Sequence, residues 1–386
     1  MVADSYTPRL LRPPEESYFL LGPRGTGKST WLRHQYPSAM RIDLLLGEEE
    51  RRYSAYPEKI RDIAAELPEG STLILDEIQR VPRLLPEIHF LIEQKRKIQY
   101  IMTASSTRKL RRSVSDLLGG RDLLRQMGPF LASELKERFS LEKALKTGLI
   151  PLIWESANGG HRLSDYLQLY LREEVQAEGL VRQIGDFSRF LEIASFSHAS
   201  IWTTTDISRE SSVKRATVDN YLQILEDLLL AFTIPVFTRR AKRKLIAHPK
   251  FYFFDAGVYR ILRPLGILDN SQEIEGLALE GLVAQHLRSW VIAQNQPHSL
   301  SFWRTQTKLE VDFVVYGPKG FWAIEVKRGP NLGPDDVRAL SAFKEEYPEA
   351  TCFFVVPGKR RENYRGFPVL PVEDFLKNIH PDFPLE

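Results

Sequence analysis

The stretch "GPRGTGKST", residues 22–30, restricts the fold of this chain more than any other segment. Gly22, Gly27, Lys28 and Ser29 match the spacing G-x-x-x-x-G-K-[ST], with an apolar strand pattern before them and a helix start after them. Glycines at these places let backbone N–H groups converge on phosphate oxygens. The segment therefore predicts a strand–loop–helix that binds a nucleotide.

The side chains of this loop have expected roles in binding ATP and Mg²⁺. Lys28 is expected to reach the β- and γ-phosphates, and the hydroxyl of Ser29 is expected to hold Mg²⁺. The full set predicted to bind the nucleotide is Gly22, Gly25, Gly27, Lys28, Ser29, Thr30, Asp76 and Ser105.

A second segment, "STLILDEIQ" at 71–79, supplies acidic residues for the same site. Its apolar run leads directly into Asp76 and Glu77, as in a buried parallel strand. We expect Asp76 to hold Mg²⁺ and Glu77 to orient the attacking water as general base. "LILDE" alone is a common strand end, so this prediction depends on the preceding loop.

A third strand, "IQYIMTASS", ends in Ser105 and Ser106. Either serine can contact the γ-phosphate or the attacking water, or it can cap a following helix. Further on, Arg121 stands before another strand, where it is either an arginine finger for a neighbouring subunit or a solvated turn residue.

The order of these motifs resembles the AAA+ superfamily. More narrowly, "GPRGTGKST", "LDEIQ" and "LLGGR" before "PF" resemble a group of prokaryotic ATPases with an uncharacterised C-terminal region. That group usually has "TGSS" where this chain has "TASS", so Ala104 leaves the sensor residue open. The resemblance implies ATP hydrolysis and a homo-oligomer, possibly a hexamer.

The middle of the chain has a helical pattern and then a helix-turn-helix pattern. We expect a helical lid at 139–187 and a winged helix-turn-helix at 188–255 that binds DNA with weak sequence specificity. A winged helix that contacts protein, or a merely solvated charge run, stays open. The residues predicted to contact nucleic acid are Lys214, Arg215, Arg239, Arg240, Lys242, Arg243 and Lys244.

Two carboxylates interrupt the alternating apolar pattern of "LEVDFVVYGPKGFWAIEVK", residues 309–327. If Pro318 and Lys319 form a two-residue turn, Asp312 and Glu325 face each other across a hairpin. Like charges placed so are destabilising, and Mg²⁺ between them would remove the repulsion. The residues predicted to bind metal are Ser29 and Asp76 at the nucleotide and Glu280, Asp312 and Glu325 here.

D-x₁₂-E-x-K after a helix bearing Glu280 resembles the PD-(D/E)xK nuclease family, although the first motif is "VD". The resemblance makes Asp312 and Glu325 metal ligands and Lys327 a catalytic lysine of phosphodiester cleavage. A solvated hairpin face and a nuclease fold without activity are the alternatives. The residues predicted to be catalytic are Lys28, Glu77, Arg121, Asp312, Glu325 and Lys327.

Composition limits the remaining choices. The chain has 386 residues, which is long enough for several domains. Its net charge of +3 is too small to prove a nucleic-acid partner, so any basic signal must be local. Its single cysteine, Cys352, excludes a disulfide framework and fits the cytoplasm. The N-terminal segment lacks the apolar core of a signal peptide, and we expect no membrane span.

We therefore expect a multidomain α/β protein: an AAA+ P-loop core at 1–138, the lid, the winged helix, and a restriction-endonuclease-like domain at 256–386. The predicted function is ATP-dependent processing of DNA with Mg²⁺-dependent cleavage. The alternatives are a motor that remodels DNA without cutting it, and an ATP-dependent switch or scaffold whose nuclease fold is inactive.

Overall fold

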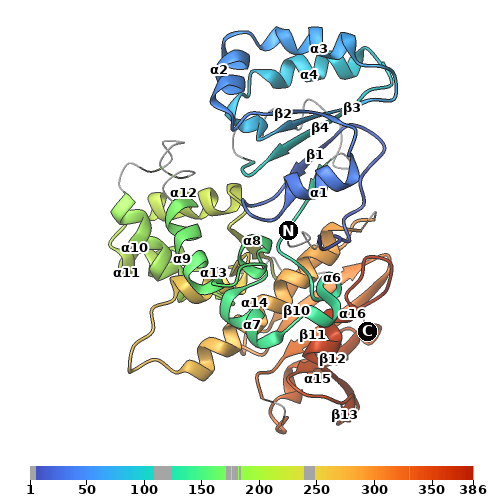
Figure 1. Ribbon diagram of the computed structural model, residues 1–386. Helices are drawn as coiled ribbons and strands as arrows, with labels where there is room; N and C mark the ends of the chain where they lie inside the picture. The colour runs from blue at the N-terminus through green and yellow to red at the C-terminus, as the bar shows by residue number, and fades with distance from the viewer. Residues whose placement is uncertain are drawn as a thin grey trace. The chain divides into compact units, whose positions relative to one another are not determined.

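The computed structural model (Figure 1) groups the chain into two compact units. The N-terminal unit is Leu11–Gly128 with Glu226–Leu229, and the C-terminal unit is Met1–Leu10, Pro129–Leu225 and Leu230–Glu386. The structure describes residues 6–107, 124–170, 175, 181, 184–238, 248–294, 296–329 and 331–385.

The N-terminal unit contains a sheet of parallel strands in the order β2-β3-β4-β1-β5. The strands are β1 Tyr18–Leu21, β2 Met40–Asp43, β3 Thr72–Asp76, β4 Gln99–Ala104 and β5 Leu124–Gln126. Parallel sheets of this kind are covered on both faces, which explains why β1 and β3 are continuous apolar runs. The predicted parallel α/β core is confirmed.

Helices cover both faces of this sheet. They are α1 Lys28–Gln35, α2 Gly47–Ala55, α3 Ile60–Glu66 and α4 Leu84–Glu93. In Figure 1, α3 and α4 lie on one side of the strands and α1 on the other. The side chains of Phe19, Leu73 and Leu75 pack with those of Ile60 and Ile88 into one buried cluster. This packing fixes the carboxyl ends of β1, β3 and β4, where the predicted nucleotide residues lie.

The helices after residue 130 pack within the C-terminal unit. They are α6 Ala132–Leu135, α7 Leu141–Thr147, α8 Pro151–Trp154 and α9 Gly159–Tyr170, and α7 and α9 pack against α13 Ala256–Leu262. Gly148 joins α7 to the next turn with a φ of 75°, and a Cβ there would meet Asp255 Oδ1 at 1.8 Å. The role of these helices as a lid stays a prediction.

A helical segment with a small sheet follows. Its elements are α10 Ile184–Ser195, β6 Ser200–Ile201, α11 Thr204–Ser211, α12 Arg215–Asp227, β7 Ala231–Ile234 and β8 Lys250–Phe253. The strands pair antiparallel in the order β6-β8-β7. Phe187, Phe190, Trp202 and Tyr221 make edge-to-face ring contacts that join the helices, as aromatic pairs in cores often do.

The C-terminal sheet has the order β13-β14-β12-β11-β10-β9. Its strands are β9 Ser299–Arg304, β10 Glu310–Gly317, β11 Gly320–Val326, β12 Thr351–Val356, β13 Glu362–Tyr364 and β14 Phe367–Pro371. Gly317 pairs with Gly320, so Pro318 and Lys319 form the two-residue turn that the sequence predicts.

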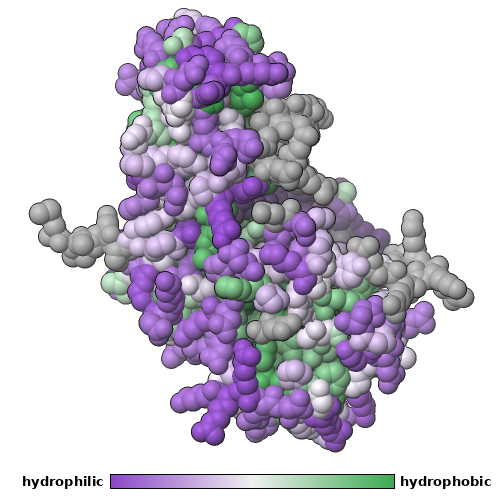
Figure 2. Space-filling view, turned by 90° about the vertical axis from the view of Figure 1, so that its right-hand side faces the viewer, coloured by the Kyte–Doolittle hydropathy of each residue, from purple (hydrophilic) through white to green (hydrophobic). Residues whose placement is uncertain are grey.

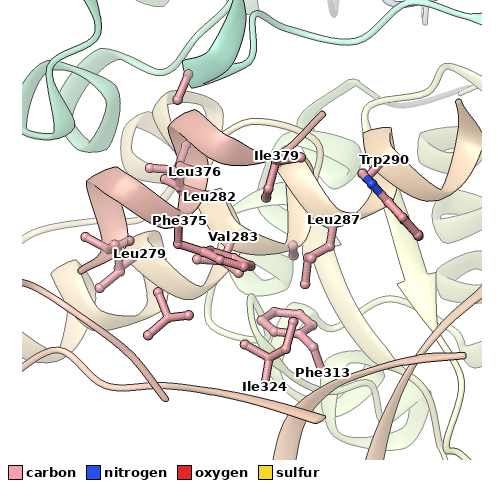
Figure 3. Packing of buried hydrophobic residues seen from close by; sticks show 14 of the residues in the cluster. Leu279, Leu282, Val283, Leu287, Trp290, Phe313, Ile324, Phe375, Leu376 and Ile379 are labelled. Atoms are coloured by element: carbon pink, nitrogen blue, oxygen red, sulfur yellow. The ribbon is translucent and has the colours of Figure 1, made fainter. Parts of the chain in front are cut away.

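Helices enclose this sheet on both faces. They are α14 Ser271–Ile292, α15 Val337–Glu346 and α16 Val372–Asn378. Leu282 and Val283 of α14 pack with Phe313 of β10, Ile324 of β11 and Phe375 of α16 (Figure 3). Leu340 and Phe343 of α15 belong to a separate buried cluster on the opposite face. The long helix α14 is therefore held tightly enough to place Glu280 beside the strands.

The chain between β7 and β8 is tied to the C-terminal sheet. Phe237 N–H donates to Phe302 O at 2.7 Å, and Phe302 N–H donates to Pro235 O at 3.0 Å. The ring of Phe237 packs near those of Tyr316 and Tyr347. The small sheet and the C-terminal sheet are thus continuous parts of one unit.

Hydrophilic residues cover most of the face shown in Figure 2, and hydrophobic residues gather in smaller areas. Ile267 and Leu268, in the loop between α13 and α14, are fully exposed apolar side chains. Among the described residues, no helix is both long and apolar enough to cross a membrane.

Candidate functional site

The glycine-rich loop places Lys28 at the end of β1. Its ammonium donates to Gly22 O at 2.7 Å and lies 3.7 Å from Glu77 Oε1, and the side chain is 5% exposed. A Cβ on Gly22 would come within 2.2 Å of Met127 O, so only glycine fits there. The predicted phosphate-binding lysine is therefore buried, close to one carboxylate and to backbone carbonyls.

Two further glycines give the loop its shape. Gly25 has a φ of 80° and Gly27 has a φ of 88°, a left-handed conformation that other residues rarely adopt. Gly27 O then accepts from Trp31 N–H at 2.8 Å, which starts α1. Ser29 and Thr30 lie in the first turn of this helix, where unpaired backbone N–H groups attract anions.

The two acids at the end of β3 make different contacts. Thr103 of β4 donates its hydroxyl proton to Asp76. Glu77 has a φ of 60°, strained for a non-glycine residue, and its N–H donates to Thr103 Oγ1 at 2.9 Å. Strain of this kind is common at functional sites, where it aims a side chain. Here it points Glu77 towards Lys28.

Glu77 is held by a small polar network. Its Oε2 accepts from Gln79 Nε2 at 2.6 Å and from Ser105 Oγ at 2.9 Å, and Gln79 also donates to Ser105 at 2.8 Å. Ser105 therefore lies beside the predicted general base. The roles of Gln79 and Thr103 were not predicted, although both belong to the motifs "LDEIQ" and "MTASS".

The residues gathered here fit a nucleotide with its magnesium ion. Lys28 can neutralise phosphate charge, and Ser29 with Asp76 offers oxygen ligands of the kind Mg²⁺ prefers. Arg121, the predicted arginine finger, lies outside the described residues.

Comparison with known families agrees with this geometry. A family model for an AAA domain, AAA_14, matches residues 14–136. This part of the chain is an AAA-type ATPase domain. Two models of domains of unknown function match the rest: DUF8612 at 138–270 and DUF4143 at 275–375. The first match implies nucleotide binding, whereas the other two matches assign no activity.

Comparison with solved structures adds little. The chain is similar to a signal transduction ATPase with numerous domains (STAND) that has a tetratricopeptide repeat sensor, from Pyrococcus horikoshii. They are 14% identical, the match covers 72% of this chain and 45% of that one, and the TM-score is 0.21. So low a score supports no argument about fold or function. No curated protein matches the chain.

The predicted nucleic-acid residues are only partly described. Lys214 and Arg215 are exposed at the start of α12. The other five lie outside the described residues: Arg239, Arg240, Lys242, Arg243 and Lys244.

The two carboxylates of the C-terminal hairpin are neighbours, as predicted. The ladder between β10 and β11 reaches Phe313 opposite Ile324, so Asp312 and Glu325 come next on their strands. Val326 N–H donates to Asp312 Oδ2 at 2.9 Å, and Asp312 N–H reaches Glu325 Oε2 at 3.4 Å. Each carboxylate is thus bonded to the partner strand's backbone.

Glu325 also pairs with Lys327. The distance from Lys327 Nζ to Glu325 Oε1 is 2.9 Å, and Asp336 Oδ1 lies 3.3 Å from the same ammonium. Burial and then the nearby Asp312 raise the pKa of Glu325 to about 8, although Lys327 acts in the opposite direction.

Glu280 and Asp312 meet around Lys250, which the sequence did not predict to lie in this cluster. Lys250 Nζ lies 3.0 Å from Glu280 Oε1, 3.3 Å from Asp312 Oδ1 and 2.7 Å from Glu310 Oε1. Its side chain is 2% exposed. The three acids predicted to share one ion are therefore divided: Glu280 and Asp312 contact Lys250, and Glu325 contacts Lys327.

The charges of this cluster change the pKa values of its members. Burial lowers the pKa of Lys250, but the surrounding carboxylates outweigh it and raise the pKa well above its usual range. Burial, with Asp312, raises the pKa of Glu280 to about 7. Among the described residues, no group of three or more His, Cys, Asp or Glu side chains is arranged to hold a metal ion.

Proposed function

We propose that this protein is an ATP-dependent switch that acts on nucleic acid. The observation that carries the proposal is the network at the end of β3, in which Glu77 is aimed by strained backbone and held by Gln79 and Ser105. A carboxylate positioned in this way can accept a proton from an attacking water. Lys28 and the loop N–H groups would meanwhile stabilise the phosphate charge.

Mg²⁺ belongs to this proposal. Ser29 and Asp76 would hold the ion, and its charge would offset the negative charge that develops on the phosphate oxygens. Thr103 keeps Asp76 oriented by donating to it. Each acid of the proposed site is thus held by hydrogen bonds. Thr103 orients Asp76, and Gln79 and Ser105 orient Glu77.

Nucleic acid is the proposed partner because of the element order after residue 184. Helix, short strand, two helices and two antiparallel strands follow one another, in the order typical of a winged helix. Exposed Lys214 and Arg215 begin the helix that such modules place against DNA. We propose contacts to phosphates, with weak sequence specificity.

Assembly and location complete the proposal. We propose a homo-oligomer, possibly a hexamer, in which Arg121 reaches a neighbour's nucleotide. A cytoplasmic location fits the single cysteine, Cys352, whose buried thiol has a pKa raised to about 11 by burial. The AAA domain would then change state with its nucleotide and pass the change on to bound DNA.

A second candidate function is Mg²⁺-dependent cleavage of DNA by the C-terminal unit. It is favoured by the adjacency of Asp312 and Glu325 and by Lys327 beside them. This candidate requires Glu280, Asp312 and Glu325 to share one metal ion and Lys327 to orient the attacking water, an arrangement that the contacts of Lys250 with Glu280 and Asp312 oppose. Single-turnover incubation with labelled DNA, Mg²⁺ and ATP separates the two, since only this candidate forms a product that Asp312→Ala abolishes.

The primary test is steady-state ATP hydrolysis with and without DNA. We expect hydrolysis by the wild-type chain, stimulation by DNA, and loss of both in Lys28→Ala. Hydrolysis that is indifferent to every nucleic acid offered would contradict the assigned partner. Undetectable ATP binding by a folded wild-type chain would contradict the whole proposal.

A further inference from the structure

We propose that Lys250 is a built-in counter-cation that takes the place of a divalent metal ion between Glu280, Glu310 and Asp312. While its ammonium occupies this position, the cluster binds no divalent cation. This inference does not depend on the ATP site, because its test is made without nucleotide.

The contacts of the ammonium are the first argument. A lysine ammonium has three N–H donors and no acceptor. Three carboxylates from two elements, α14 and β10, lie between 2.7 and 3.3 Å from Nζ. Each donor can therefore face one carboxylate, so the positive charge is fully used within the protein.

The second argument is that the fold itself places Lys250 between the three carboxylates. Lys250 begins β8, where it pairs with Ile201 of β6 and Ile234 of β7. Both neighbouring strands fix the backbone of Lys250, and its side chain is 2% exposed. The fold itself therefore places the ammonium in the interior. The ammonium also lies over the ring of Phe302, with Nζ 5.7 Å from the ring centroid.

The third argument is that other donors also bind the three carboxylates around Lys250. The hydroxyl of Tyr252, two residues further along β8, donates to Glu280 Oε1 at 2.7 Å. Arg304 Nη1 lies 3.0 Å from Glu310 Oε2, and Val326 N–H donates to Asp312 Oδ2 at 2.9 Å. Every carboxylate of the cluster thus has a second donor besides Lys250.

Distances and charge argue against an ion beside the lysine. Mg²⁺ requires oxygen ligands at about 2.0–2.1 Å in a near-octahedral shell. The carboxylates here surround a nitrogen at 2.7–3.3 Å, which is the spacing of charge-assisted hydrogen bonds. An ion at the same point would meet the ammonium itself, and the like charges would repel each other.

The test is a titration with Mn²⁺, followed by the electron paramagnetic resonance signal of the free ion. Full-length chains are used without nucleotide: wild type, Lys250→Met, and Lys250→Met combined with Asp312→Asn. Methionine keeps much of the length of the lysine stem without its charge. Lys344→Met is the matched control, because Lys344 donates to Ala350 O rather than to a carboxylate.

We expect Lys250→Met to bind one Mn²⁺ per chain that wild type does not bind, because the freed carboxylate oxygens are ligands that such ions prefer. The double variant should lose that ion, and Lys344→Met should behave as wild type. A folded Lys250→Met chain that gains no ion would overturn the proposal.

A second comparison keeps the proposal testable if Lys250→Met does not fold. Wild type and Asp312→Asn are titrated in the same way, and their Mn²⁺ binding should be equal. An ion bound by wild type and absent from Asp312→Asn would show that the metal coexists with Lys250, contrary to the proposal.

Discussion

Two buried lysines with nearby carboxylates lie in the two units of this protein, and they differ in what their charge is used for. Lys28 contacts one carboxylate at 3.7 Å and otherwise two backbone carbonyls. Lys250 contacts three carboxylates at 3.3 Å or less. The first therefore keeps positive charge for a ligand, whereas the charge of the second is used up inside the fold.

The difference teaches how to interpret a cluster of charged residues. An acid-rich motif is less able to bind a cation when another part of the chain already neutralises its charge. Lys250 is 62 positions before Asp312 in the sequence, so no local pattern connects them.

The largest expected effect concerns the acid that faces Lys28. Glu77→Gln should lower the rate of ATP hydrolysis by about 10²–10⁴-fold, the usual contribution of a general base. ATP binding should change only a few-fold, because Lys28 and the loop remain. Hydrolysis and nucleotide affinity are measured on the same preparation.

Glu66→Gln is the matched control for that variant. Glu66 is an exposed acid at the end of α3 in the same unit. Equal losses of hydrolysis in both variants would mean that Glu77 has no special role.

The second expected effect concerns Lys250. In the presence of a chelator, Lys250→Met should lower the free energy of unfolding of the C-terminal unit by about 3–5 kcal/mol, since three half-buried carboxylates lose their buried counter-charge. Urea unfolding followed by tryptophan fluorescence measures it. A change below about 1 kcal/mol, typical of an exposed ion pair, would contradict the buried cluster.

The third expected effect is a pH dependence of stability caused by Asp255, a buried acid that accepts hydrogen bonds from backbone N–H groups. Asp255 caps α13 and accepts from Leu149, Gly257 and Val258 N–H groups. Burial raises its pKa to about 6, despite these donors. The folded state therefore holds this proton more tightly than the unfolded chain, and the resulting stability is lost as the pH rises through about 6.

Asp255→Asn removes that titration. Between pH 4 and 7 the free energy of unfolding of wild type should fall relative to the variant by up to about 3 kcal/mol. Asp269 is the control of opposite sign, because the N–H of Gly266 and Arg263 lower its pKa. The stability that Asp269 contributes should be lost as the pH falls. Identical pH profiles of unfolding free energy for Asp255→Asn and Asp269→Asn would therefore refute the role assigned to Asp255.

The smallest effect concerns the exposed start of α12. Changing Lys214 and Arg215 to alanine should weaken duplex DNA binding several-fold and lower the salt dependence by about one ion per lost phosphate contact. Arg338→Ala, an exposed arginine on α15, is the control. Unchanged affinity at every salt concentration would remove this helix from the interface.

Local motifs predicted much of this structure. The loop at 22–30, the acids at 76 and 77 and the two-residue turn at 318 and 319 depend on short-range patterns, and each is found as an element or contact of the expected kind. Lys250 could not be predicted to meet Glu280, because their contact depends on how β8 packs beside α14 and β10. Gln79 was within a recognised motif, but only coordinates show its bonds to Glu77 and Ser105.

The most direct test of the contrast between the two lysines is the number of divalent ions bound by the wild-type chain with and without ATP. The account predicts one Mn²⁺ per chain that appears only with ATP and disappears in Ser29→Ala. An ion bound without nucleotide and removed by Asp312→Asn would contradict it.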